Sequence, residues 1–360
     1  MDSNLDIFAK RLLQARLKAK LSMDKLSEKM DRIVTKQAIS KYEKAKMMPS
    51  STILIAMSEA LNVDLDYFFR PFTFDLDQFK VSFRKKSDTT IGDQKALKVQ
   101  IQDEVERYIE IENILDIKHD VLLSEALVPS KTLESNHDMV KMAQKVREEW
   151  KLGNAPIANT LELLECYGIK VLLTGAPDNF DGVSGVVNDN NLVIVLNSRT
   201  SYIERRRLTA MHELCHLLYD NYFSEALTAH QKENLCNAFA NEMLLPCEIL
   251  LSRFERKKHI TYSELESLSC NYGISIDAIV YKLKDLGIVG EKRYRGFCIQ
   301  KRQNPTFNEF VVRPRYNEEP TTRFKDMVYD ALAQGLISTS KAAMLLGVSI
   351  ANVRKKSYTI

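Results

Sequence analysis

Two histidines and a glutamate between residues 212 and 216 have types and a spacing that suit metal binding. The run is His212-Glu213-Leu214-Cys215-His216. Side chains four residues apart lie on one face of a helix, so His212 and His216 can bind the same zinc ion. Glu213 can then reach a zinc-bound water and act as the general base for attack on a peptide carbonyl. The motif therefore predicts a catalytic metal site.

The alternative interpretation of this motif is an amphipathic helix with surface histidines, which predicts polar surroundings. The interleaved residues are instead apolar: Leu208, Met211, Leu214, Cys215, Leu217 and Leu218. A largely buried helix with two imidazoles and a carboxylate needs a compensating partner, which a cation supplies. We therefore expect Zn²⁺ as the cofactor.

A third metal ligand is expected because catalytic zinc usually has three protein ligands and a water. The next predicted helix carries a polar stripe of Glu233, Asn237 and Asn241 on an otherwise apolar sequence. We favour Glu233 as the ligand, with Asn237 hydrogen-bonded to one of the histidines.

Other residues near the motif could in principle bind the metal. Glu242, Glu225 and His230 are the rival third ligands. Among the cysteines, Cys215 should point about 100° away from His216 around the helix. Cys236 is expected to fill a small slot in the core.

Several predicted elements must position this helix. Helices are expected at 139–150 and 157–167, followed by a strand at 169–173. Strands at 182–187 and 192–196 are joined by Asn188-Asp189-Asn190-Asn191, a strong hairpin signal. The metal-binding helix, about residues 201–219, follows this hairpin directly.

The runs RLTAMHELCH (207–216) and CNAFANEMLLP (236–246) resemble the ImmA/IrrE-type (M78-like) zinc metallopeptidase family. The resemblance covers the chain from about Phe79 to at least Pro246. It departs at Cys215 and Cys236, where the family usually has glycine and alanine, and neither change removes a catalytic group.

This resemblance implies a zincin-like core with Glu233 as the third ligand. It also implies that the strand at 192–197 is a sheet edge that pairs with an extended substrate. Proteins of this kind typically cleave a repressor or antitoxin-like partner that itself has a helix-turn-helix.

A second constellation lies near the N-terminus, where charge is strongly segregated. Residues 10–46 hold twelve Lys/Arg and four Asp/Glu, a local charge of +8, whereas the whole chain carries only +3. A basic segment on a weakly acidic remainder predicts an acidic partner for that segment.

The same segment is predicted to form about five short helices, with Ser22 and Thr35 as helix caps. The runs VTKQAISKYE (34–43) and ALNVDLDYF (60–68) resemble the XRE-type (Cro/repressor-like) helix-turn-helix domain. Ala45 departs from the usual glycine, so we expect a slightly different turn there.

In a recognition helix the early outward side chains meet base edges in the major groove. Those positions are Lys36, Gln37, Ser40 and Lys41. Glutamine can pair with adenine and lysine can donate to guanine. We therefore expect double-stranded DNA as a partner; a helical bundle for protein contact is the less favoured alternative.

The expected fold class is α+β: an all-α helix-turn-helix bundle, then a zincin-like α+β metallopeptidase domain, then a helical C-terminal region. The expected ranges are 1–72 for the DNA-binding domain, 73–135 for a connector, with a strand at 79–83, and the start of the peptidase region, 136–260 for the peptidase core and 261–360 for the C-terminal region. The connector's acidic helix, residues 96–115, is expected to expose its carboxylates to solvent.

The C-terminal region is expected to be mostly helical, with short strands near Cys298 and at 310–313. Its run STSKAAMLLGVS (338–349) looks like a helix-turn-helix. A second DNA reader and a packing appendage over the peptidase domain both remain open for it.

The composition, 45% hydrophobic and 28% charged residues, is that of a water-soluble globular protein. No apolar run is long enough for a membrane span and the first thirty residues lack a secretion signal, so we expect a cytoplasmic protein. The six cysteines, without a C-x-x-C pair, are expected to be buried and reduced.

Two functions fit these features. The first is a DNA-binding regulatory endopeptidase that cleaves a repressor or antitoxin-like protein. A homodimer of this chain is the expected assembly. The second is a transcriptional regulator whose zinc domain is a sensor or interaction module without turnover. The intact Glu213 favours the first, since a structural zinc site has no need of a base.

Overall fold

The computed structural model describes residues 4–74, 90–117, 125–177, 180–188, 190–200 and 202–356. The strand expected at 79–83 lies outside these ranges. Two compact units are present: residues 1–118 together with 323–360, and residues 119–322. Within the described residues no helix is both long and apolar enough to span a bilayer.

The first unit begins with a helical bundle, and its helices begin and end where local sequence signals predict. The Ser22 side chain accepts from the amide of Lys25, and Thr35 accepts from Ala38, so both expected caps are present. Apolar residues from every helix meet in one core, including Phe8, Leu12, Leu26, Ile39 and Phe68. The elements are α1 (Asn4–Lys18), α2 (Met23–Lys29), α3 (Lys36–Glu43), α4 (Ser51–Leu61) and the 3-10 helix η1 (Leu65–Phe69).

The turn after α3 keeps the geometry for which glycine is preferred, although Ala45 occupies it. Ala45 has φ of 53°. The amides of Ala45 and Lys46 donate to the carbonyls of Tyr42 and Lys41, which is the Schellman pattern. The turn therefore ends α3 in the usual way, with an alanine in the left-handed conformation, and the expectation of a different turn was wrong.

The acidic helix α5 (Ile91–Ile114) does not present a solvated face, and that expectation was wrong. Asp103 and Glu106 are buried. Asp103 lies 2.6 Å from both Lys18 and Arg70, and Glu106 lies 2.7 Å from Arg11. The cations come from distant segments of the same unit, so the pattern of α5 alone could not reveal these buried ion pairs.

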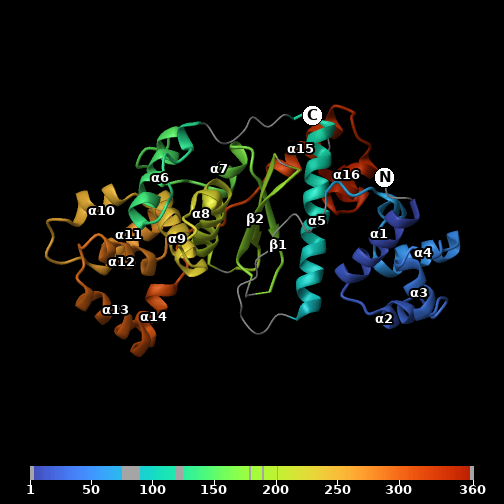
Figure 1. Ribbon diagram of the computed structural model, residues 1–360, viewed down its shortest axis with the longest axis horizontal. Coiled ribbons are helices and arrows are strands. Elements are labelled where there is room, and N and C mark those ends of the chain that lie inside the picture. Colours follow the sequence, from blue (N-terminus) through green and yellow to red (C-terminus); the bar gives the residue numbers. More distant parts are fainter. Residues whose placement is uncertain are drawn as a thin grey trace. The chain divides into compact units, whose positions relative to one another are not determined.

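Helices α15 (Arg323–Ala333), α16 (Thr339–Leu346) and α17 (Ile350–Lys356) complete the first unit, where Figure 1 shows α15 and α16 beside α5. The rings of Phe324 and Tyr108 contact each other at a tilt of 32°, with centroids 5.3 Å apart. Arg107 donates to the Leu345 carbonyl at 3.1 Å. The expected region 261–360 is thus divided between the two units, because α15 and α16 pack on α5.

The second unit is an α+β layer structure around a three-stranded sheet with the order β1-β3-β2. Strand β3 (Asn191–Asn197) pairs in parallel with β1 (Lys170–Thr174) and antiparallel with β2 (Gly182–Val187). The expected hairpin is present, but β3 is the central strand. The assignment of 192–197 as the substrate-binding edge was therefore wrong.

The helices of the second unit surround one large core. They are α6 (Asn136–Glu149), α7 (Thr160–Cys166), α8 (Ile203–Tyr219), α9 (Ala229–Leu244), α10 (Cys247–Phe254), α11 (Tyr262–Tyr272), α12 (Ile276–Asp285), α13 (Glu291–Gln303) and α14 (Pro305–Val312), with 3-10 turns at Glu125–Leu127 and Asp220–Tyr222.

Helices α13 and α14 occupy the region where short strands were expected, so the prediction of strands there was wrong. Asn304 caps α14 by accepting from the amide of Phe307, and Pro305 takes the first helical position. Proline there is a helix-start signal, which outweighs the short apolar run at 310–312.

All six cysteines are free thiols. Cys215 and Cys236 are buried, whereas Cys166 and Cys270 are exposed. The expectation of burial was therefore wrong for the latter two.

Candidate metal centre

The two histidines of the motif face the same point. Helix α8 packs against the sheet and against α9, and it buries Met211, Leu214 and Leu218 on the way. His212 and His216 lie one turn apart, and their Nε2 atoms are 3.1 Å from each other. Two lone pairs can therefore be directed at a single site.

Glu233 on α9 completes this arrangement. One carboxylate oxygen lies 3.3 Å from Nε2 of His212, and the other lies 3.6 Å from Nε2 of His216. Hydrogen bonds from the two histidines hold the pKa of Glu233 well below its usual range. The structure thus brings together two imidazoles and a carboxylate anion, which is a donor set that zinc accepts.

The other nitrogen of each ring has an oxygen partner. Oδ1 of Asn237 lies 3.0 Å from Nδ1 of His212, and Oδ1 of Asp220 lies 2.7 Å from Nδ1 of His216. Acceptors in these places keep the ring protons on Nδ1 and leave Nε2 free for a metal. The donor set and these partners together fit a zinc ion.

The contact of Asn237 with a motif histidine was expected from the sequence, but the contact of Asp220 with His216 was not. Asp220 follows His216 by four residues and caps the end of α8. The i, i+4 spacing used for the histidines would have found it.

Glu213 lies on α8 beside the first histidine and is held by the sheet. The Ser184 hydroxyl on β2 donates to Oε2 of Glu213 at 2.7 Å. Burial raises the pKa of the Glu213 carboxyl, and the nearby histidines act in the opposite direction. A raised pKa suits a residue that must accept a proton and later release it.

Glu242, Glu225 and His230 do not contribute to this cluster. Glu242 is fully buried and forms an ion pair with Lys282. Glu225 and His230 are exposed, and His230 pairs with Asn234 at 3.2 Å.

Cys236 lies closer to the centre than expected. It is fully buried, as predicted for a core residue, but its Sγ atom is 3.8 Å from Nδ1 of His216. Its sulfur and one nitrogen of each histidine lie within 4.8 Å of one another. We favour Glu233 over Cys236 because the Glu233 oxygens contact Nε2 of both rings, whereas the Cys236 sulfur contacts Nδ1 of His216, the nitrogen that Asp220 engages.

Arg207 precedes the motif on α8 but serves the fold. Its side chain is fully buried and paired with Glu319. It also donates to the carbonyls of Gly273 and Ile157, at 3.0 and 2.8 Å, and its guanidinium stacks over Tyr316. These contacts fix the start of α8 and leave the side chain no role in polarising a substrate.

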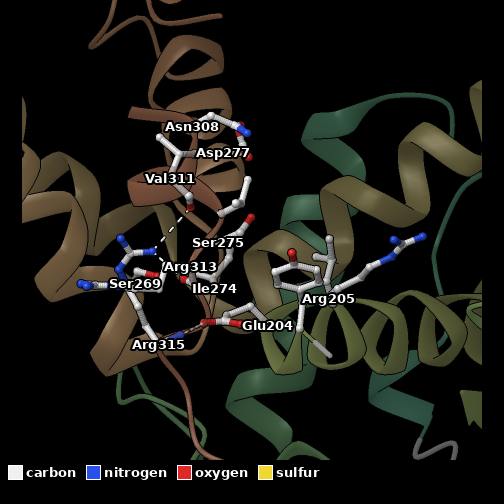
Figure 2. A pocket seen from close by; sticks show the side chains of 13 residues that line it. Glu204, Arg205, Ser269, Ile274, Ser275, Asp277, Asn308, Val311, Arg313 and Arg315 are labelled. Atoms are coloured by element: carbon white, nitrogen blue, oxygen red, sulfur yellow. Dashed lines mark hydrogen bonds between the residues drawn. The ribbon is translucent and has the colours of Figure 1, made fainter. Parts of the chain in front are cut away.

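A pocket of about 460 Å³ opens at the N-terminal end of α8 (Figure 2). Its lining includes Tyr202, Arg205 and Leu208 together with residues of α11, α12 and α14. Neither histidine of the motif lines it. The pocket is therefore separate from the metal centre.

The residues expected to contact DNA lie on α3 in the first unit. Lys36, Gln37 and Lys41 are exposed, and Ser40 is partly exposed. Lys36 forms an exposed ion pair with Asp24 at 2.6 Å. Ile39 and Tyr42 point inward and hold the helix on the core.

Comparisons with known proteins match both parts of the chain. Residues 12–68 match the helix-turn-helix family, and residues 164–284 match the IrrE N-terminal-like domain of peptidase family M78. Both resemblances seen in the sequence are thereby confirmed. No curated protein matches the chain.

Two solved structures align over most of the chain but with low scores. Bacillus thuringiensis PlcR in complex with the peptide PapR7 and DNA aligns over 98% of this chain and 97% of its own, at 12% identity and a TM-score of 0.19. The apo form of the competence regulator ComR from Streptococcus vestibularis aligns over 93% and 100%, at 13% identity and a TM-score of 0.18. The family matches, and not these alignments, bear on function.

Proposed function

From a chain that joins a helix-turn-helix domain to an IrrE N-terminal-like domain, we propose a DNA-binding regulator that is also a zinc-dependent endopeptidase. Its substrate would be a repressor or antitoxin-like protein, as the family resemblance implies. One observation carries the proposal. Two imidazoles and a carboxylate converge on one point while an oxygen holds the far side of each ring.

His212, His216 and Glu233 would hold the metal. Zinc bound there would polarise the scissile carbonyl and make water acidic enough to lose a proton near neutral pH. Glu213 would accept that proton and later donate it to the leaving amine. Ser184 would keep the Glu213 carboxylate aimed at the site through its 2.7 Å hydrogen bond.

The substrate would bind along β2 rather than β3. In the described part of the chain β2 pairs only with β3, so its other edge is available to an added strand. Ser184 lies on β2 and contacts Glu213. An extended peptide on this edge would therefore pass beside the general base.

DNA binding would use α3. Lys36, Gln37, Ser40 and Lys41 form its outward face, and Thr35 fixes where the helix begins. A helix of this kind places its first turns in the major groove. Cleavage of a partner would then be coupled to a particular site on the genome.

The test combines metal content with cleavage. Zinc per chain is measured for the wild type, His216→Ala, Glu233→Gln and the matched control Glu225→Gln, which also alters an exposed glutamate. We expect about one zinc in the wild type and in the control, and loss of most of it in the other two. Equal zinc in all four proteins contradicts the proposed ligands.

Glu213→Gln separates the peptidase from a non-catalytic sensor. Each variant is incubated with purified helix-turn-helix repressors from the same genome, and products are identified by mass spectrometry. We expect Glu213→Gln to retain zinc and to lose cleavage by at least about 100-fold. Undiminished cleavage would show that the base is misassigned, and no cleavage of any partner by the zinc-loaded wild type would favour the sensor.

A further inference from the structure

We propose that α16 and α17 form a second helix-turn-helix and that α17 binds duplex DNA through its exposed face. This inference is independent of the zinc centre and of α3. It assigns a binding surface to residues 338–356, which lie outside both family matches.

The segment has the geometry of the motif. Ser338 caps α16, and the helix ends at Gly347, which has φ of 64°. Ser349 then caps α17 by accepting from the amide of Asn352 at 3.3 Å. The two helices are thus joined by three residues that include a glycine, as in a helix-turn-helix.

Comparison with α3 shows which side of α17 points outward. Thr35 caps α3 by accepting from the third residue after it at 3.3 Å, as Ser349 does in α17. Four residues after each cap a fully buried side chain anchors the helix, Ile39 in α3 and Val353 in α17. The positions that correspond to Lys36, Gln37, Ser40 and Lys41 are Ile350, Ala351, Arg354 and Lys355.

The module is fixed on one side and exposed on the other. Helix α16 is held by Arg107 at the Leu345 carbonyl and by an ion pair between Lys341 and Glu110. In α17 only Val353 is buried among the described residues of the helix. A packing appendage would bury the second helix as it buries the first, and α17 does not follow that pattern.

The charge of the module matches nucleic acid. Residues 323–360 hold six Lys/Arg and two Asp, a local charge of +4, and three of the cations are the consecutive Arg354, Lys355 and Lys356. Since residues 10–46 carry +8 and the whole chain +3, the remainder carries −9. The module itself, residues 338–356, holds four Lys/Arg and no Asp/Glu, so none of its own side chains would repel phosphate.

The exposed face offers both kinds of contact that DNA requires. Arg354, Lys355 and Lys356 would meet phosphates, which gives salt-dependent affinity. Ile350 is 41% exposed although it is apolar. An apolar side chain at the start of such a helix can contact the methyl group of thymine in the major groove.

The experiment measures binding of the full-length chain to a fluorescein-labelled 25-base-pair duplex of random sequence, by anisotropy, from 50 to 300 mM NaCl. The test variant is Lys355→Gln/Lys356→Gln. The matched control, Lys141→Gln/Lys145→Gln on α6, removes two exposed lysines from the second unit. A third protein, Gln37→Ala/Lys41→Gln, reports on α3 separately.

We expect the α17 variant to bind roughly tenfold or more weakly at 100 mM salt, with a log–log salt slope reduced by about 1.8, because two phosphate contacts are lost. The α6 control should match the wild type. A fourth protein combines the α17 and α3 substitutions, and in it the α17 pair should weaken binding further than the α3 pair alone, so failure of the α3 assignment would be seen separately.

A second variant, Ala351→Glu, guards against misfolding as the cause. A glutamate in the first turn favours the helix but repels phosphate, so it should weaken DNA binding without lowering the melting temperature. The proposal is overturned if both α17 variants bind like the control, or if the wild type does not bind the duplex at 50 mM salt. It is also overturned if the variants change only self-association in sedimentation.

Discussion

Removal of Asp220 gives a graded prediction at the metal centre. The Asp220 carboxylate lies 2.7 Å from Nδ1 of His216, and the Asn237 amide oxygen lies 3.0 Å from Nδ1 of His212. Loss of such a partner usually lowers metal affinity by about 10–100-fold, which corresponds to about 1.4–2.8 kcal/mol. The surroundings of each pair decide which end of that range applies.

Exposure separates the two cases. The side chains of Asp220 and His216 are 58% and 20% exposed, so water can take the place of the lost acceptor. We therefore expect Asp220→Ala to weaken zinc binding by about tenfold, at the lower end. The His212 side chain is only 7% exposed, so Asn237→Ala should approach about 100-fold.

The assay is competition for zinc between each purified protein and a chromophoric chelator at pH 7.5. Asp220→Asn is the control, because it keeps an acceptor near Nδ1 and should lie within about threefold of the wild type. The order of the effects is the critical result. If Asp220→Ala costs more than Asn237→Ala, or if neither changes affinity, the reasoning from burial and ring orientation is refuted.

Three further predictions concern stability. Ala45→Gly should stabilise the first unit by about 0.5–1 kcal/mol in urea unfolding, since glycine relieves the left-handed strain at φ of 53° but costs some entropy. Gly182→Ala should destabilise the second unit by about 1–3 kcal/mol, because the new methyl group would lie 2.7 Å from Thr209 on α8; an unchanged unfolding midpoint would contradict the close packing. The pKa of Glu264 is lowered to about 2, chiefly by the hydrogen bond from Lys257. The stabilisation that this carboxylate contributes is therefore present above its unfolded pKa of about 4.3 and is lost as the pH falls toward 2. Glu264→Gln should lower the urea midpoint at pH 6, and the difference in midpoint between variant and wild type should narrow below pH 4.

The sequence was sufficient where the signal is local. Ser22 and Thr35 are caps in the structure because a hydroxyl before a helical run has one favourable use, which is to accept from the exposed amides. The facing of His212 and His216 follows from helical spacing alone. That Glu233 lies near them could be inferred only from the next helix, where polar residues recur at every fourth position of an otherwise apolar sequence.

Contacts between segments far apart in the chain were not predictable in this way. Ser184 reaches Glu213 only because β2 packs on α8, and no spacing in the sequence encodes that contact. The hairpin signal identified two strands but not the parallel pairing of β1 with β3, which makes β3 central. The carboxylates of α5 likewise look solvated until Arg11 and Arg70 are placed beside them.

The division of the first unit into residues 1–118 and 323–360 bears on how the chain is made. About 200 residues separate the two pieces, so at usual elongation rates the ribosome adds the second piece about 10–40 s after the first. During that interval α5 exists without α15 and α16, and the Tyr108 ring lacks Phe324, whose ring it contacts in the folded unit. A chain that stops before residue 323 would therefore lack α15 and α16 and leave the first unit, which carries α3, incomplete.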